Sequence, residues 1–461
     1  MANGTGLPTV AVIGGGLAGC ECALGLADRG VRVRLYEMRP GTMTPAHAGG
    51  RLAELVCSNS LKAVRLDSAA GLLKAELRRL GSRLLPLAER AAVPAGGALA
   101  VDRDVFSGLV EDEVSRHAGI EVVRREVAEV PPEGPVVIAA GPLCSGALAR
   151  HVESLVGGAR LSFYDAAAPI VDAATLDGDR VFAQSRYDRG EGEDYLNCPM
   201  DKDAYDRLVE ELVGAERAIL RDFERRDLFQ ACQPVEEVAR TGRDALRFGA
   251  LKPVGIVDPA TGRRPWAVVQ LRAENRERSA YNLVGFQTNL TWPEQRRVFR
   301  MIPGLEHAEF FRYGVMHRNT FVDAPRALDA TFTLRTDRRV RFAGQITGTE
   351  GYTEAIATGL LAAVNTWADL TGGTVAPLPA TTALGSLVAY ATSPETVDYQ
   401  PMHVNFGLVP PLERTGKMPK RDRYAAYARR ALDDLELWCA GNARAAGVPA
   451  AAEGAAPGAG R

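Results

Sequence analysis

One stretch near the N-terminus, residues 9–40, restricts the folds that this chain can adopt. It opens with an apolar run at 10–13, and three glycines follow, Gly14, Gly16 and Gly19, with the spacing Gly-x-Gly-x-x-Gly. An Ala/Leu-rich segment comes next, and a second apolar run at 31–36 ends at Glu37. This order predicts a β-strand, a tight turn, a helix and a second strand, as at the start of a dinucleotide-binding fold.

Each part of this unit has a physical role in such a fold. The first glycine permits the tight turn, the second lets the backbone approach a pyrophosphate, and the third lets helix and strand pack closely. The N–H groups at the helix N-terminus face the phosphates, and Glu37 stands where a carboxylate can bind a ribose. The alternative is a glycine-rich turn in an ordinary βαβ unit. The predicted cofactor-binding residues are Gly14, Gly15, Gly16, Leu17, Ala18, Gly19 and Glu37.

A second glycine loop comes late in the chain. Residues 341–346 resemble a strand with Gly344 near its end, residues 347–352 form a loop that includes Gly351 and Tyr352, and an Ala-rich helix is expected over 353–370. Another helix N-terminus of this kind suits the far end of a flavin. Together the two loops favour FAD over NAD as the resident cofactor, with Gly344, Gly351 and Tyr352 in its site.

The segment between the two loops is rich in arginine and aromatic residues and suggests an insert. We therefore expect an α/β protein, in which a discontinuous FAD-binding Rossmann-like domain of the glutathione-reductase type carries an inserted α+β domain. The predicted boundaries are 1–175 and 325–440 for the two parts of the FAD domain, 176–324 for the insert, and 441–461 for a disordered tail. A length of 461 residues is consistent with more than one domain.

Composition excludes some classes of protein. Lys+Arg 55 against Asp+Glu 57 gives a net charge of -2, which excludes a globally basic nucleic-acid binder but permits a local basic face. No apolar run approaches the roughly 18–20 residues of a membrane span, and the N-terminus lacks a signal-peptide pattern. Seven scattered cysteines form no disulfide framework and six histidines show no ligand spacing. We expect a cytoplasmic protein without a metal.

Several longer strings are far more specific than the glycine spacing. They include LVCSNSLK, YLNCPM, RFGALKPVG, QLRAENRERSAYNLVGFQTNL and FAGQITGTEGYTEAIATGLLAA. With them the chain resembles, over nearly its whole length, the bacterial folate- and FAD-dependent tRNA (uracil-5-)-methyltransferases. The resemblance implies methylation of carbon 5 of a T-loop uridine in tRNA. It also implies methylenetetrahydrofolate as carbon donor, reduced FAD as methylene carrier and hydride donor, NAD(P)H as reductant, and a monomer.

The alternatives are an FAD-dependent oxidoreductase of a small metabolite, another FAD-dependent enzyme that modifies tRNA uridines, and a non-catalytic FAD-binding partner. Methylation at carbon 5 needs a thiolate that adds to carbon 6 of uracil and a base that removes the carbon-5 proton. The resemblance implies Cys232 as the better candidate for the nucleophile and Cys57 for the base, with exchanged roles also possible. Cys198 is a third candidate. The alternative for each is a buried structural cysteine.

Three further features complete the predicted site. Residues 52–61 have the apolar pattern of a helix start, but Cys57-Ser58-Asn59-Ser60 suggests backbone close to something bound. His47 could contact flavin or folate, although such a histidine is more often structural. The arginines Arg272, Arg276 and Arg278 are predicted to contact tRNA phosphates. Their alternative is a solvated face with internal ion pairs, since Glu274 and Glu277 alternate with them.

Overall fold

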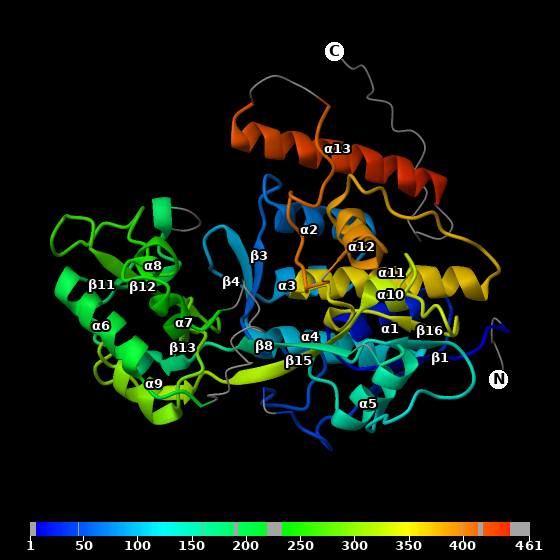
Figure 1. Ribbon diagram of the computed structural model, residues 1–461, viewed down its shortest axis with the longest axis horizontal. Helices are drawn as coiled ribbons and strands as arrows, with labels where there is room; N and C mark the ends of the chain where they lie inside the picture. The colour runs from blue at the N-terminus through cyan, green and yellow to red at the C-terminus, as the bar shows by residue number, and fades with distance from the viewer. Residues whose placement is uncertain are drawn as a thin grey trace, which may run out of the picture.

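A five-stranded parallel sheet forms the centre of the larger domain (Figure 1). The computed structural model describes residues 6–44, 46–158, 160–188, 192–218, 233–397, 399–413 and 418–442, of which 160–166 and 316–318 as backbone only. All neighbouring strands of this sheet pair in parallel, with β1 in the middle. In spatial order the strands are β16 (Val340–Phe342), β7 (Val136–Ile138), β1 (Val10–Ile13), β2 (Val33–Glu37) and β6 (Ile120–Arg124).

Two helices from opposite ends of the sequence pack directly against each other beside this sheet. Helix α1 (Leu17–Asp28) follows β1, and α11 (Tyr352–Leu370) follows β16. Their backbones approach closely, because a Cβ on Gly359 of α11 would overlap the carbonyl group of Ala18 in α1. One turn along, a Cβ on Gly25 would lie 2.9 Å from the Ala363 methyl group. Small residues therefore place both predicted helices in one layer.

Further elements surround this pair. In chain order they are β3 (Ser60–Ala63), α2 (Ala69–Arg79), α3 (Leu84–Arg90), β4 (Ala92–Val93), β5 (Ala98–Val101), α4 (Arg103–Arg116), α5 (Gly146–Leu155), α10 (Ala324–Ala327), α12 (Ala383–Thr392) and α13 (Lys420–Gly441). Strands β3, β5 and β4 form a small antiparallel sheet. Helix α13 lies along the outside over α2 and α12 (Figure 1). The predicted tail lies mostly at 443–461, outside the described residues.

The predicted helix start at 52–61 is wrong. Residues 53–59 form turns and a loop, and β3 begins at Ser60. Side-chain oxygens accept the N–H groups that a helix would use, since Tyr352 Oη accepts from Cys57 and Ser58, and Ser58 Oγ accepts from Ser60 N. Such local hydrogen bonds compete with helix formation.

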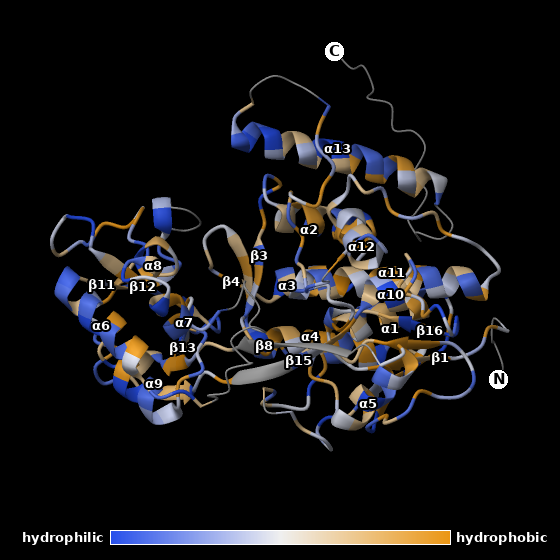
Figure 2. Cartoon of the chain, in the orientation of Figure 1, coloured by the Kyte–Doolittle hydropathy of each residue, from blue (hydrophilic) through white to orange (hydrophobic). Residues whose placement is uncertain are grey.

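The insert has a sheet and a hydrophobic core of its own (green, at the left of Figure 1). Its six antiparallel strands are, in spatial order, β10 (Phe182–Ala183), β11 (Tyr195–Met200), β12 (Ala267–Ala273), β13 (Ala280–Leu283), β9 (Ile170–Asp172) and β14 (Phe310–Arg312). The helices α6 (Lys202–Gly214), α7 (Val235–Arg240), α8 (Ala245–Phe248) and α9 (Trp292–Phe299) complete it. Figure 2 shows hydrophilic residues on the outer face of α6, whereas Leu208 and Leu212 are buried in the core.

A two-stranded antiparallel ribbon joins the insert to the larger domain. It consists of β8 (Arg160–Ala166) and β15 (Met316–Val322), which pair along their full lengths and run side by side in Figure 1. Val171 already packs in the core of the insert, whereas Phe321 packs in the core of the larger domain. These contacts favour an insert of about 167–315 over the predicted 176–324, and we propose these boundaries.

The packing of α1 against α11 generates a stability prediction. Replacing Gly359 by Ala should lower the free energy of unfolding by about 1–3 kcal/mol, because the added methyl group forces two helix backbones apart. Chemical denaturation followed by circular dichroism measures the change. Gly214→Ala is the matched control, since a Cβ on this residue at the end of α6 would meet nothing within 4 Å. A loss of stability as large in the control would contradict the packing argument.

Candidate active site

A cleft opens where the parallel strands end and where α1 and α11 begin. The residues around it come from both parts of the discontinuous domain. They are Ile13, Gly14, Gly16, Leu17, Ala18, Tyr36, Glu37, Met38, Arg39, His47, Glu54, Val56, Arg125, Glu126, Val127, Ala139, Ala140, Gly141, Pro142, Leu143, Cys144, Ser145, Leu148, Gly344, Gln345, Tyr352 and Ala355. Ligands of open α/β sheets bind at this edge, outside the carboxyl ends of the strands.

The first glycine turn has the geometry that a dinucleotide requires. Gly14 has φ +107°, and a Cβ there would lie 2.5 Å from the carbonyl oxygen of Ala139 on the neighbouring strand, so this position needs glycine. A Cβ on Gly16 would meet no protein atom within 4 Å, which leaves room for a ligand close to the backbone. The helical hydrogen bonds start with Cys20 N to Gly16 O at 2.9 Å. The N–H groups before Cys20 therefore lie at the helix N-terminus, where an anion binds favourably.

Glu37 lies at the end of β2 and lines the cleft, but it also has protein partners. Its Oε2 accepts a hydrogen bond from Gly15 N at 3.0 Å, and its Oε1 accepts from Arg39 Nε at 2.9 Å. Burial alone would raise the pKa of Glu37, but the Arg39 guanidinium outweighs it and holds the pKa below its ordinary value of 4.5. The contact of Glu37 with a ribose stays a prediction, and its carboxylate is ionised at neutral pH.

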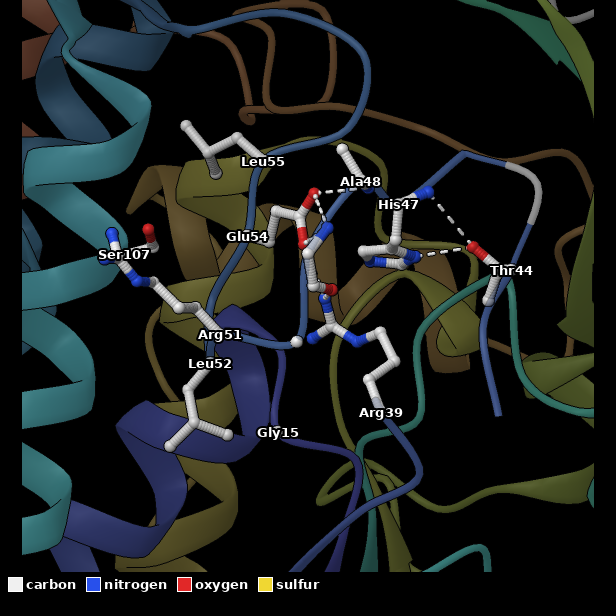
Figure 3. A network of polar contacts seen from close by, with 12 residues as sticks. Gly15, Arg39, Thr44, His47, Ala48, Arg51, Leu52, Glu54, Leu55 and Ser107 are labelled. Atoms are coloured by element: carbon white, nitrogen blue, oxygen red, sulfur yellow. Dashed lines mark hydrogen bonds and ion pairs between the residues drawn. The ribbon is translucent and has the colours of Figure 1, made fainter. Parts of the chain in front are cut away.

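Arg39 connects Glu37 to the loop that covers this end of the cleft. Figure 3 shows Arg39 beside Glu54, Ala48, His47 and Thr44 of this loop. Its Nη1 donates to Glu54 Oε2 at 2.9 Å, and Glu54 Oε1 accepts from Ala48 N at 2.7 Å. On the same loop, His47 Nδ1 lies 2.6 Å from Thr44 Oγ1, and the His47 side chain lines the cleft. The buried Arg39 thus fixes the loop against β2. The sequence signal for this residue was its position two residues after Glu37, and it was not among the predicted site residues.

The second glycine loop brings α11 to the same cleft. Gly351 is the residue before α11 and has φ +122°, which L side chains rarely adopt. Gly344, Gln345 and Tyr352 line the cleft opposite the first glycine turn. Two helix N-termini therefore point into one cavity, and their partial positive charges favour a ligand with phosphates and an electron-rich ring. These residues fit FAD.

Tyr352 joins the cleft to the loop that carries Cys57. Its Oη accepts hydrogen bonds from the N–H groups of Cys57 at 2.9 Å and Ser58 at 3.2 Å. Burial raises the pKa of Tyr352, so the phenol stays protonated at neutral pH. Cys57 is partly exposed, and its neighbour Val56 lines the cleft. The sequence predicted both Cys57 and Tyr352 as site residues, and the structure brings them together.

The remaining cysteines differ in burial and in their distance from the cleft. Cys232, the predicted nucleophile, lies outside the described residues. Cys198 is fully buried in β11, and burial raises the pKa of its thiol well above the ordinary value, which suits a structural residue. Cys20 and Cys22 are likewise buried on α1, with pKa values raised by burial. Two of the described cysteines lie at the cleft, since Cys144 is one of its lining residues and Cys57 follows Val56, which also lines it.

The predicted arginine cluster is separated in the structure. Arg272 is buried in β12 and donates to Asn59 Oδ1 at 2.7 Å and Ser58 Oγ at 2.8 Å. Its predicted contact with tRNA phosphates stays a prediction, and these internal partners do not favour it. The Arg272 side chain lies on the buried face of β12. Arg276 and Arg278 are exposed in the turn that follows this strand. The contact of Arg276 and Arg278 with tRNA stays a prediction.

In the part of the chain that the structure describes, no three His, Cys, Asp or Glu side chains come together to hold a metal ion. No helix within the same residues is long and apolar enough to cross a bilayer.

The whole chain is similar to a defined set of proteins. A family model described as glucose inhibited division protein A matches residues 9–373. A protein of Geobacter sulfurreducens, named methylenetetrahydrofolate--tRNA-(uracil-5-)-methyltransferase TrmFO, is 57% identical over 431 residues, which cover 94% of this chain and 99% of that protein. The chain belongs to the TrmFO family. A TrmFO of Heliobacterium modesticaldum is 55% identical over 434 residues and covers 94% and 98% of the two chains.

Solved structures support the fold. Aquifex aeolicus GidA in its form II crystal superposes with a TM-score of 0.67 at 15% identity, over 96% of this chain and 74% of that chain. The form I crystal gives a TM-score of 0.66 over 93% and 76%. These matches, with the parallel sheet and its insert, confirm the predicted fold class, and the TrmFO relatives confirm the predicted family.

The buried pair of Glu37 and Arg39 generates a pH-dependent prediction. Glu37→Gln should lower the free energy of unfolding at pH 7 by about 2–3 kcal/mol, because the buried Arg39 guanidinium loses one of its two carboxylate partners and keeps only Glu54. The folded pKa of Glu37 is depressed, so its stabilisation is present above about pH 4.5 and is lost as the pH falls through the folded pKa. The difference between the two proteins should therefore shrink below about pH 4.

Urea denaturation at a series of pH values measures this difference. Glu121→Gln is the control, because Glu121 pairs with Arg34 on an exposed strand and its side chain is 63% exposed. The control should change the free energy of unfolding by less than about 0.5 kcal/mol. An effect of Glu37→Gln that stays as large at about pH 2.5 as at pH 7 would refute the electrostatic explanation.

Proposed function

We propose that this chain methylates carbon 5 of a T-loop uridine in tRNA. Methylenetetrahydrofolate is the carbon donor, FAD the resident cofactor and NAD(P)H the reductant, and the protein acts in the cytoplasm as a monomer. The names of the TrmFO relatives, of which the chain covers almost the full length, support the reaction and the donor. The observation that carries the proposal is the Cys57 loop, which is hydrogen-bonded to Tyr352 at the N-terminus of α11 beside the cleft.

The cleft residues bind and orient the cofactor in this proposal. The first glycine turn and the N-terminus of α1 take the pyrophosphate, and Glu37 takes a ribose. The N-terminus of α11, with Gly344 and Tyr352, takes the flavin end. When bound and reduced, FAD supplies the carrier for the one-carbon unit and the hydride that completes the methyl group.

The thiols act on the uracil. A cysteine thiolate adds to carbon 6 and forms a carbon–sulfur bond, so that the electron pair moves to an enolate and carbon 5 becomes nucleophilic. After carbon 5 has bonded to the one-carbon unit, a base removes the carbon-5 proton as the bond between that unit and its carrier breaks. The thiolate would then leave carbon 6, and the ring double bond return, when the methylene gains a hydride. We assign the addition to Cys232 and the proton removal to Cys57. The position of Cys57 beside the cleft supports its part in either role.

The proposed tRNA surface includes Arg276 and Arg278, which are exposed where the insert meets the larger domain. The Arg276 guanidinium also donates to the carbonyl oxygen of Arg90, which holds the turn against the end of α3. Exposed guanidinium groups bind phosphates well. Affinity for tRNA that falls as salt rises would support an electrostatic contact of this kind.

A labelling experiment tests the reaction. Purified protein with FAD, NADPH and unmodified tRNA should transfer label from methylenetetrahydrofolate to carbon 5 of a T-loop uridine, as read by nucleoside mass spectrometry. Label from S-adenosylmethionine should not appear in the product. Transfer from S-adenosylmethionine alone would refute the proposed function.

The cysteine variants test the assignment of the thiols. Cys57→Ala and Cys232→Ala should each lower the rate of methylation by at least about 10²-fold, as expected for loss of a nucleophile or a general base. Both should keep the yellow colour of bound FAD. Cys198→Ala is the control, because this thiol is buried in the insert, and its rate should stay within a few-fold. A rate for Cys57→Ala equal to that of the control would exclude Cys57 from catalysis.

A further inference from the structure

Three arginines from separate elements hold the loop that carries Cys57. Arg103, at the start of α4, donates from Nη1 to the carbonyl oxygen of Leu55 at 2.5 Å. Arg312, in β14 of the insert, donates from Nη2 to the carbonyl oxygen of Val56 at 2.8 Å. Arg272, in β12 of the insert, donates to the side chains of the two residues after Cys57. Both sides of the cysteine are therefore fixed by guanidinium groups.

Two of these guanidinium groups lie within electrostatic range of the thiol. A charged Cys57 interacts with Arg103 and with Arg312, and both arginines are largely buried, so water screens these interactions little. The Nη2 atom of Arg103 is buried and has no hydrogen-bond partner among the described residues. A buried guanidinium donor of this kind costs free energy, and the negative charge of a Cys57 thiolate would offset part of that cost through its electrostatic interaction with Arg103.

The other ionisable groups around the loop determine the net charge of its surroundings. Glu274 follows β12 and accepts from Arg103 Nε at 2.5 Å, which keeps the Arg103 fork directed at the loop. Tyr352 contributes a neutral phenol from α11. Among the described residues, the groups that hold or interact with the Cys57 loop include the cations of Arg103, Arg272 and Arg312, one carboxylate paired to Arg103, and a phenol. The net charge of this set is positive.

We propose that Arg103 and Arg312 are positioning residues that stabilise the thiolate form of Cys57. Because Arg312 and Arg272 belong to the insert, docking of the insert against the larger domain is part of what makes this thiol reactive. Asn59 strengthens the same junction, since its Nδ2 donates to the carbonyl oxygens of Val101 in β5 and Ala273 in β12. The inference rests on the proposed function for the role of Cys57, but its test needs neither tRNA nor folate.

The test is the alkylation of Cys57 as a function of pH. The FAD-bound protein is treated with iodoacetamide from pH 5 to pH 10, and mass spectrometry of its peptides follows Cys57 separately from the other cysteines. Arg103→Met and Arg312→Met should each move the midpoint of the rate profile upward by about 1–3 pH units, as expected for loss of a neighbouring opposite charge. Below the midpoint, each unit corresponds to an about tenfold lower rate.

Lysine variants distinguish charge from mere packing. Arg103→Lys and Arg312→Lys keep the cation but lose the planar fork. The pH midpoint of Cys57 alkylation in these variants should lie close to that of the unchanged protein. Equal slowing by Met and Lys, or an unchanged midpoint in both Met variants, would overturn the proposal. Where a Met variant does not fold, the Gln and Lys variants at the same position give the comparison.

Arg341→Met is the matched control for loss of a buried arginine. Arg341 is 5% exposed and donates to Thr366 and Asp369 near the C-terminal end of α11. Tyr352 stands at the other end of that helix, about 20 Å away at 1.5 Å per residue. The control should lose stability without moving the Cys57 midpoint. A correct midpoint shift together with failed methylation would refute the proposed function alone, and the reverse pattern would refute this inference alone.

Discussion

The close contact between α1 and α11 determines where the chemistry takes place. Two helices separated by most of the sequence cross where Gly359 faces the backbone of Ala18. Larger residues at this crossing would separate the helices and with them the two N-termini. Since both N-termini line one cleft, the binding of a long anionic cofactor depends on the contact of Gly359 with Ala18, a residue that itself lines the cleft.

Other helix N-termini of the larger domain are satisfied from within the protein. The carboxylate of Glu21 accepts from the N–H of Leu84 at the start of α3, and that of Glu76 accepts from the N–H of Ala383 at the start of α12. Both glutamates are fully buried, and burial raises the pKa of each to about 7. At α3 and α12, buried carboxylates of the protein accept the N–H groups of the first turn. The N-termini of α1 and α11 lie at the cleft, where a ligand can bind them.

The sequence predicted well whatever depends on local spacing. Gly14 and Gly16 have the turn geometry expected of them, and α11 begins at Tyr352, one residue before the predicted start. The sequence did not indicate local structure that depends on a partner far away along the chain. The loop at 53–59 is no helix because Tyr352 accepts its N–H groups, and Arg272 is buried because Asn59 and Ser58 receive its guanidinium. Neither partner can be found from spacing along the chain.

The ribbon of β8 and β15 has a consequence for folding. The parallel sheet is complete only when β16 pairs with β7, and the whole insert lies between these strands in the sequence. Closing so long a loop in an unfolded chain costs entropy that grows with the logarithm of its length. The pairing of Arg160 with Val322 brings the two ends of the insert together, so a folded insert acts as a short connection. Completion of the cofactor cleft is thereby expected to wait for the insert, and a chain released before that point would carry only half of its binding site.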